Sequence, residues 1–519
     1  MSTAPLTSAT IEACGPHDIE TLAKGGRTNV LGFLLRLAAR LPFLFIAGRW
    51  YGAAALGRFA YATIIVEFAG QLATMGLKRG LAQKLATTHR PHVHIVWDGL
   101  LVGWAASLVA AGVLVAVPGL MFPNSAINGM DRLLALTIFG WAGSDIALAA
   151  LAYRGDIAAT VKARSLVEPW AISIAAFVLA WYSRRDGLIL AYAISAIAAL
   201  LASLWPLFKS YGAPRGWKPE PLRLARLAQR NLPLAGADAI EWGSRRLDIA
   251  MLGLFFTPAI VGIYYVAQQV ASLPQKLKTS FDPILGPVIT QNLAEGNKQA
   301  VARQVRQVGF WIIAAQVGIA LALAIPGKAV MGLVGPSFVG GTGALAVLLA
   351  AEAIAATAVV SEAALIYLAP NRNLLISVAM IAIQAVLSVV LVHAFRAGIP
   401  LLVHWGWLSP RPAPGEDTVA AAGPAVALII ALGLASLVKA GLLSRLLRAR
   451  VNGWRWPVVW AALAGGAAGW ITTRLPHSFE WVELAAGVPL ILGTFGLVIW
   501  RYGFSDADRT LFRFEPARA

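Results

Sequence analysis

The chain has 519 residues, of which 58% are hydrophobic and 13% charged, with a formal net charge of +18. Soluble proteins carry about 25% charged residues, and here apolar stretches of about 20 residues recur from end to end. The composition predicts an all-α integral membrane protein and excludes a soluble domain of useful size. The single cysteine, Cys14, excludes an internal disulfide and a cysteine-based metal cluster.

The first segment, residues 1–27, is polar and of mixed charge. It lacks the basic start, the apolar stretch and the cleavage site of a signal peptide. We therefore expect it to be a cytoplasmic tail.

Fourteen apolar segments follow, each long enough to cross the hydrocarbon core of a bilayer. The predicted spans are 28–50, 56–78, 95–122, 132–153, 163–182, 187–208, 231–256, 259–289, 307–326, 342–368, 373–395, 419–443, 456–473 and 480–501. The corresponding domains are a six-helix bundle (28–208), a basic cytoplasmic linker (209–230), a second six-helix bundle (231–444), two extra transmembrane helices (456–501) and a cytoplasmic tail (502–519).

The basic residues test this topology. With the N-terminus in the cytoplasm, 29 of the 43 Lys and Arg residues lie in cytoplasmic segments or adjoining helix ends, nine lie on the opposite side and five lie inside spans. Cytoplasmic loops of membrane proteins carry such an excess. The bias therefore predicts that both termini are cytoplasmic.

The seventh span, 231–256, carries five charges that lipid does not tolerate: Asp238, Glu241, Arg245, Arg246 and Asp248. At the bilayer centre they would cost at most roughly 12–17 kcal/mol in total. Four of them, all except Arg246, are spaced three, four and three residues apart, which predicts one helix face. That face must line a water-filled cavity or pair within the protein, which points to a transport pathway.

An internal repeat relates the first two spans to the seventh and eighth. LGRFAYA at 56–62 resembles VGIYYVA at 261–267, with an offset of 205 residues. The same offset carries Arg40 onto Arg245 and Arg36 onto Glu241. Because spans 1 and 7 start on the same side, the repeat is parallel, with a pseudo-two-fold axis along the membrane normal. This symmetry predicts two six-helix bundles that face each other.

Polar side chains follow one face of each of these four helices. Arg36 and Arg40 lie in span 1, Glu67 and Gln71 in span 2, and Gln268 in span 8. A shared central cavity would accommodate all these faces. The alternative is that these residues form buried ion pairs that lock the helices together.

Single acidic residues elsewhere in the spans, such as Asp145 in span 4, are either protonation sites or packing partners. Two readings of the linker also stay open. LRLARLAQR has helical spacing and would suit the surface of an anionic leaflet, but it equally fits a linker that carries positive-inside charge. Aromatic residues at span ends are interpreted as interfacial anchors: Trp50, Tyr51, Trp454, Trp456 and Tyr502.

No catalytic or cofactor motif stands out. The sequence lacks GxSxG, Walker A and GxGxxG contexts, and we interpret His89, His92 and His94 as loop residues rather than metal ligands. The largest outer loop, 396–418, is short and rich in proline. We expect no enzyme, no cofactor, no metal and no nucleic-acid partner.

These segments together resemble a known family. The span-1 pattern GFLLRLAARLPFLFIAGRWYG, followed by LGRFAYA and ATMGLKRGLAQKLA, and later RRLDIAMLGLFFTPAIVGIYYVAQQVASLP with NLAEGNKQAV, resembles the polysaccharide-transporter branch (Wzx-like flippases) of the multidrug/oligosaccharidyl-lipid/polysaccharide exporter superfamily. The resemblance covers roughly residues 28 to 450. More distantly, the chain is similar to lipid II flippases and to multidrug extruders.

The resemblance implies a flippase of the bacterial inner membrane. Its substrate would be a polyprenyl-pyrophosphate-linked oligosaccharide, moved to the outer leaflet by alternating access through a cationic cavity. Partners would be membrane lipids and the polymerase and glycosyltransferase machinery, with the protein itself acting as a monomer. The candidate substrate-binding residues are Arg36, Arg40, Arg245, Arg246, Gln71 and Gln268. The candidate counter-ions or coupling residues are Glu67, Asp145, Asp238, Glu241 and Asp248.

Arginine supports this interpretation, because its planar guanidinium binds phosphate through two hydrogen bonds. One departure is that three acidic residues accompany the two arginines of span 7, so that helix is not simply a phosphate-binding surface. The alternatives are an ion-coupled multidrug exporter and a membrane enzyme of glycan assembly. Cationic drugs would favour aromatic and acidic residues over arginine, and an enzyme would need a catalytic outer loop.

Overall fold

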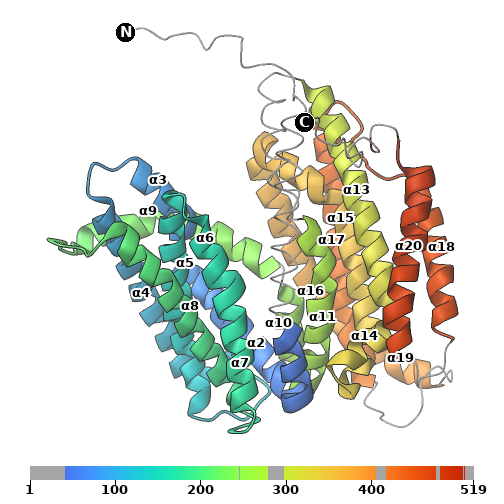
Figure 1. Ribbon diagram of the computed structural model, residues 1–519, viewed down its shortest axis with the longest axis horizontal. Coiled ribbons are helices and arrows are strands. Elements are labelled where there is room, and N and C mark those ends of the chain that lie inside the picture. Colours follow the sequence, from blue (N-terminus) through green and yellow to red (C-terminus); the bar gives the residue numbers. More distant parts are fainter. Residues whose placement is uncertain are drawn as a thin grey trace, which may run out of the picture.

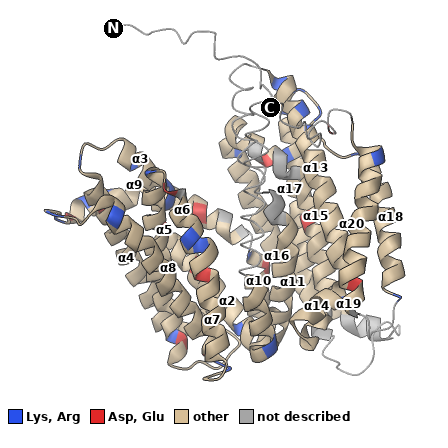
Figure 2. Ribbon diagram, in the orientation of Figure 1, with Lys and Arg blue, Asp and Glu red and all other residues tan. Residues whose placement is uncertain are grey.

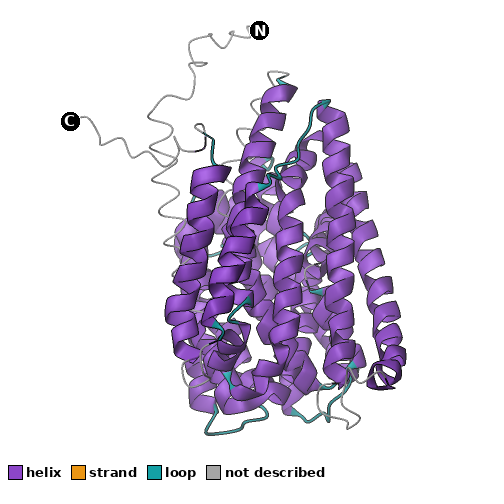
Figure 3. Cartoon of the chain, turned by 90° about the vertical axis from the view of Figure 1, so that its right-hand side faces the viewer, coloured by secondary structure: helices purple, strands orange, loops and turns teal. Residues whose placement is uncertain are grey.

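A computed structural model describes residues 41–244, 246–278, 297–404, 416–474, 480–505 and 508. Within these ranges the chain forms helices joined by loops, and no strand occurs (Figure 3). Helix is expected throughout, because the bilayer offers no partner for an unpaired backbone amide or carbonyl. The all-α membrane fold predicted from the sequence is confirmed.

The helices divide into two halves, which meet at the lower end in Figure 1 and spread apart toward the upper end. The first half contains α2 (Gly52–Ala73), α3 (Leu77–Ala86), α4 (His92–Ala116), α5 (Leu133–Tyr153), α6 (Ile157–Val161), the π-helical turn η5 (Lys162–Val167), α7 (Glu168–Leu179), α8 (Gly187–Tyr211) and α9 (Pro221–Ser244). The second half contains α10 (Leu247–Phe255), α11 (Pro258–Lys278), α13 (Lys298–Ala324), α14 (Gly327–Val334), α15 (Thr342–Leu368), α16 (Pro370–His404) and α17 (Glu416–Leu447). Helices α18 (Pro457–Thr472) and α20 (Val488–Val498) pack on the outer side of α13, and the short helix α19 (Glu480–Val482) lies between them in the chain.

Nine helical segments among the described residues are long and apolar enough to cross a membrane, and Pro457–Thr472 is a shorter apolar helix. Large apolar side chains are exposed on their outer faces, for example Leu108, Trp205 and Leu437. Such exposure is unfavourable in water but favourable against lipid tails. The outer surface therefore supports the multi-pass prediction.

The two helices related by the repeat, α2 and α11, pack directly against each other. A Cβ atom added at Gly57 would overlap the carbonyl oxygen of Pro258, and one added at Gly262 would overlap that of Ala53. Gly57 and Gly262 are separated by the 205-residue offset, and so are Ala53 and Pro258. A pseudo-two-fold axis between the helices requires this reciprocal contact, which supports the parallel repeat predicted from the sequence.

Apolar side chains of both halves fill the lower end around this contact. Leu56 and Phe59 of α2 belong to the same buried cluster as Leu252 of α10 and Val261 of α11. The second half has a further cluster around Phe310 and the first half another of its own. Each half thus has an apolar cluster of its own, and the two halves share a third cluster at the lower end.

The seventh predicted span is divided. Helix α9 begins at Pro221 and ends at Ser244, α10 begins at Leu247, and Arg246 lies between them with φ −133° and ψ 4°. The prediction that 238, 241, 245 and 248 line one helix face is therefore wrong, because the helix is interrupted inside the stripe. Arg246 is the residue that the structure describes at this interruption.

Helix α9 also differs from the predicted boundary at residue 231. Its first ten residues come from the predicted linker, and its next turns lie on α3 of the first half, where a Cβ atom at Gly80 would overlap the Asn231 side chain. The linker sequence LRLARLAQR is thus helical, as its spacing predicted. The chain passes into the second half only after Ser244.

Replacing Gly57 with alanine should destabilise the fold. The added methyl group would have to displace the backbone of α11, and overpacking of this kind costs roughly 1–3 kcal/mol. The matched control is Gly112→Ala on α4, where the added Cβ has no neighbour within 4 Å. We expect the thermal unfolding midpoint of the purified protein to fall for Gly57→Ala and to stay unchanged or rise for Gly112→Ala. Equal midpoints would contradict the close helix contact.

Candidate functional site

Arg246 lies where the chain leaves α9 and enters α10, so it is positioned between the two halves. Its side chain is 35% exposed, and its Nη1 atom lies 3.3 Å from Oε2 of Glu67 on α2. Its guanidinium also lies over the ring of Trp242, 5.0 Å from the centroid. The interruption of the helix thus directs a permanent positive charge across the boundary between the halves.

Glu67 is held by the first half as well. The hydroxyl of Tyr192 on α8 donates to Glu67 Oε1 at 3.1 Å, and Trp141 Nε1 on α5 donates to the same tyrosine oxygen at 2.5 Å. Glu67 is therefore fixed by a tyrosine of its own half while it pairs with Arg246 beyond α9. Such support reduces the cost of burying a carboxylate that is only partly solvated.

Asp145 belongs to a second cluster in the first half. It is paired with Arg164 of η5, and Lys78 Nζ lies 3.8 Å from its Oδ2. Arg164 also donates to Glu168 at 2.8 Å and lies over the ring of Trp141, 4.2 Å from its centroid. Asp145 is thus a counter-ion for an arginine outside the predicted site.

Trp141 joins the two clusters, since its ring contacts Arg164 and its Nε1 contacts Tyr192. A continuous series of polar contacts therefore runs from Arg246 through Glu67 to Asp145. Sequence reasoning missed Arg164, Trp141 and Tyr192. In the sequence, Arg164 counts only toward the positive-inside bias, and the other two resemble ordinary aromatic residues of a span.

Asp248 on α10 is almost fully buried and is bound by neutral donors from α11. Tyr264 donates to it at 2.8 Å, and Gln268 Nε2 donates to both its oxygens at 3.0 Å. Among the described residues no basic side chain forms an ion pair with it. Two predicted site residues, Asp248 and Gln268, thus lie together.

Asp238 is separated from Asp248 by the end of α9. It pairs with Arg79 of α3, whose Nε atom lies 2.9 Å from Asp238 Oδ1.

Gln71 is buried on α2, one turn from Glu67. Arg36, Arg40 and Arg245 lie outside the described residues, and so does the side chain of Glu241.

The lower end of the halves is closed by the loop between α4 and α5. Asn124 of this loop donates to the carbonyl oxygens of Gly253 at 2.8 Å and Phe256 at 3.1 Å, at the α10–α11 corner of the second half. Arg396 of α16 donates to the Phe255 carbonyl of the same corner at 2.7 Å. Asn124 therefore connects the loop to the second half, and Arg396 fixes the corner to α16 within that half.

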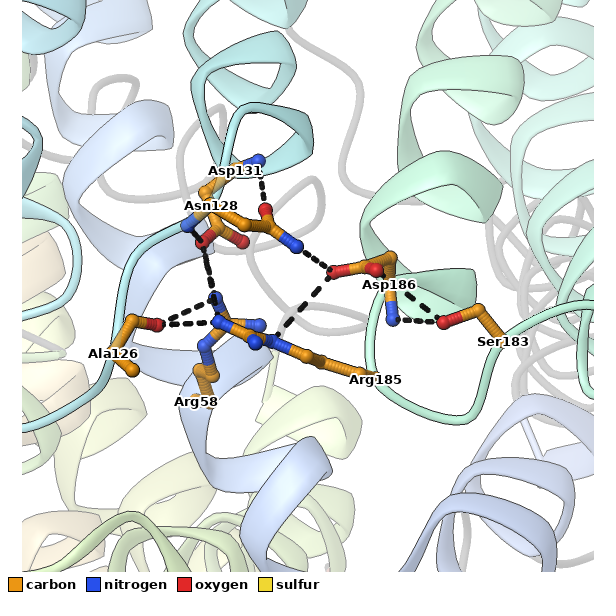
Figure 4. Close-up of polar contacts among 7 residues, drawn as sticks. All are labelled: Arg58, Ala126, Asn128, Asp131, Ser183, Arg185 and Asp186. Carbon is orange, nitrogen blue, oxygen red and sulfur yellow. Dashed lines mark hydrogen bonds and ion pairs between the residues drawn. The ribbon is translucent and has the colours of Figure 1, made fainter.

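The same loop is anchored to the first half by a cluster of charged residues (Figure 4). Arg58 of α2 is paired with fully buried Asp131, and Arg185 donates to the Ala126 carbonyl at 2.7 Å. Asn128 donates to Asp186, at the start of α8, at 3.0 Å. Figure 4 shows these groups converging from α2, the α4–α5 loop and the α7–α8 turn, so the loop is fixed on one half and hydrogen-bonded to the other.

Together, the architecture defines a multi-pass membrane protein with two pseudo-symmetric helical halves and charged residues between them. The chain belongs to the family described as polysaccharide biosynthesis protein, which matches residues 48–331. Among curated proteins, no sequence matches this chain.

Solved structures with the same fold are a flippase and transporters. The chain is similar to a lipid II flippase, MurJ, in an inward closed conformation, with a TM-score of 0.63, 10% identity, and coverage of 91% of this chain and 99% of that one. It is similar to an inward-facing multidrug resistance MATE transporter of the MOP superfamily, with a TM-score of 0.59, 12% identity and coverage of 80% and 99%. An outward-facing MATE transporter gives a TM-score of 0.54, 13% identity and coverage of 82% and 98%. These likenesses confirm the fold that the sequence motifs predict.

The pair of Glu67 and Arg246 should show energetic coupling. In a double-mutant cycle with Glu67→Gln and Arg246→Gln, we expect a coupling energy of about 1 kcal/mol, reduced from that of a buried pair because Arg246 is partly exposed. The matched control is the exposed pair Glu220 and Arg223, spaced i,i+3 on the surface and 2.6 Å apart. That pair should couple by less than about 0.5 kcal/mol. The measurement is denaturant unfolding of the purified protein, and equal coupling of both pairs would contradict the network.

Proposed function

We propose that the protein is a flippase of the bacterial inner membrane that moves a polyprenyl-pyrophosphate-linked oligosaccharide from the cytoplasmic to the outer leaflet. The observation that carries the proposal is Arg246, a permanent cation inside a membrane span and between two halves of a transporter fold. Its planar donors suit the oxygens of a pyrophosphate. The match to a polysaccharide biosynthesis family supports a glycan-linked substrate.

In this mechanism the pyrophosphate competes with Glu67 for Arg246. Displaced Glu67 keeps its hydrogen bond from Tyr192, so the carboxylate remains stabilised while the arginine binds substrate. Arg36, Arg40 and Arg245 would add positive charge to the cavity, with Gln71 and Gln268 as further polar contacts. Glu241 and Asp238 would balance this charge in the resting protein.

Transport proceeds by alternating access between the first half, which includes α9, and the second half, which begins with α10. The described contacts support a state closed at the lower end, where Asn124 bridges the halves. Lys and Arg gather mainly at the upper end, near α3, α9 and the start of α13 (Figure 2). We assign this end to the cytoplasm by the positive-inside rule, so the protein faces inward and both termini are cytoplasmic.

The membrane potential assists this direction. An inside-negative potential drives an anion outward, and for two negative charges at about 100 mV the gain is roughly 4.6 kcal/mol. If a cation is also coupled, Asp248 is the acidic residue we propose for it. Neutral Tyr264 and Gln268 donate hydrogen bonds to its carboxylate, so a proton can bind there without breaking any ion pair that the described residues form.

The same observations disfavour the alternatives. An exporter of cationic drugs would place acidic and aromatic groups, rather than Arg246, between the halves. The solved structures of similar fold are a flippase and transporters, which supports a function without catalysis. We propose that a monomer, alongside glycosyltransferases and a polymerase, is the working unit.

Loss of the arginines should abolish export without loss of the protein. We expect Arg246→Ala, Arg245→Ala and Arg40→Ala each to remove surface polysaccharide and to leave the lipid-linked oligosaccharide in the cytoplasmic leaflet. Arg246→Lys should restore export only in part, because lysine lacks the planar pair of donors. Surface polysaccharide, membrane insertion and the leaflet of the lipid-linked intermediate are the measurements.

The matched control is Arg226→Ala, which removes an exposed charge from the early part of α9 and should leave export intact. Full export by the Arg246→Ala protein would exclude the assigned role of this residue. Export of drugs with normal polysaccharide would favour the multidrug alternative.

Fixing the lower end closed should stop transport. Since Cys14 is the only cysteine, Cys14→Ser gives a background in which Asn124→Cys and Phe256→Cys can be joined by a short bifunctional reagent. We expect crosslinking to block export, because the halves cannot separate there. In the control, His92→Cys and Tyr153→Cys join α4 and α5 within the first half, where the native rings lie 5.7 Å apart, and export should persist. Unimpaired export after complete crosslinking of the first pair would contradict alternating access through this end.

A further inference from the structure

A separate cavity of about 220 Å³ lies in the second half, at the upper ends of α13 and α17. Its lining contains three arginines, Arg303 and Arg306 from α13 and Arg450 from the segment after α17. It shares no residue with the candidate site around Arg246. A cavity needs only about 10–15 Å³ to hold a water molecule, so this one has room for a phosphate group.

The charge around the cavity is strongly positive. None of the three arginines forms an ion pair with another described residue, whereas the neighbouring Arg455 pairs with Asp508 at 2.8 Å. The cavity also lies at the first turns of α13, a helix of 27 residues whose N-terminus is the positive end of its dipole. Arginines and helix terminus together favour an anion.

The surroundings place the cavity at the boundary between lipid and water. The segment after Arg450 returns along α13, where a Cβ atom at Gly453 would lie 2.8 Å from the Arg306 carbonyl oxygen. Directly after it come two exposed aromatic residues, Trp454 and Trp456, the second 71% exposed. Exposed tryptophans next to apolar helices mark the headgroup level of a bilayer.

We propose that this cavity binds the phosphate of an anionic phospholipid from the adjacent leaflet. Three arginines supply donors to the phosphate oxygens, while the acyl chains extend along the apolar faces beside α18. A phospholipid is favoured over a soluble phosphate because Arg450 of the lining is followed within six residues by the exposed Trp454 and Trp456. The site is additional to the proposed flippase function and does not depend on it.

The test measures binding of radiolabelled phosphatidylglycerol to the delipidated full-length protein, with phosphatidylcholine as the zwitterionic comparison. We expect saturable binding of phosphatidylglycerol and a loss of about tenfold in affinity in the triple variant Arg303→Gln, Arg306→Gln, Arg450→Gln. The control triple variant is Lys162→Gln, Lys209→Gln, Arg215→Gln. It removes equal charge from the same end, outside the cavity, and should bind as the wild type does.

A second variant keeps the charge and removes the space. Ala449→Trp fills the cavity, so it should also lower the affinity for phosphatidylglycerol. Equal binding by the two triple variants, or undiminished binding by Ala449→Trp, would overturn the proposal. Displacement of the lipid by inorganic phosphate would assign the cavity to a soluble anion instead. Because no transported substrate is present, the outcome is independent of the flippase activity.

Discussion

A charge inside a membrane requires a partner inside the protein, and this requirement organises the centre of the molecule. Arg246 is a cation within a predicted span, and Glu67 provides its counter-charge from the other side of the boundary between the halves. Glu67 in turn needs Tyr192, which needs Trp141, so the arrangement extends through three helices of the first half. The polar contacts there are a consequence of one arginine at a helix break.

The second constraint is steric and applies at the lower end. Two glycines at equivalent positions of the repeat let α2 and α11 approach until backbone meets backbone. The shared apolar core and the Asn124 hydrogen bonds lie at this same end. The polar contacts near the middle are therefore distinct from the close packing at the lower end. The pseudo-two-fold symmetry is seen mainly in that close packing, where α2 and α11 make reciprocal contacts.

Much of the fold was accessible from the sequence, because span length, positive-inside bias and the 205-residue repeat are all properties of residue order. The candidate site was accessible only in part. Charged residues in spans were easy to find, but their partners were not, since Arg79 and Arg164 look like ordinary topological charges. The interruption at Arg246 also escaped prediction, because helical spacing on both sides of it continues in phase. Pairing between distant helices depends on packing, which periodicity does not encode.

The position of that interruption has a mechanical consequence. Helix α9 is packed on the first half and α10 on the second, so residues 244–247 tether the halves at the depth of Arg246. Three residues of extended chain span at most roughly 10–11 Å. At this depth the halves cannot part further than the tether allows, and relative motion there is mostly a change of angle. A ligand held by Arg246 therefore lies close to the pivot of this motion. There, a change of angle between the halves reorients the ligand more than it displaces it.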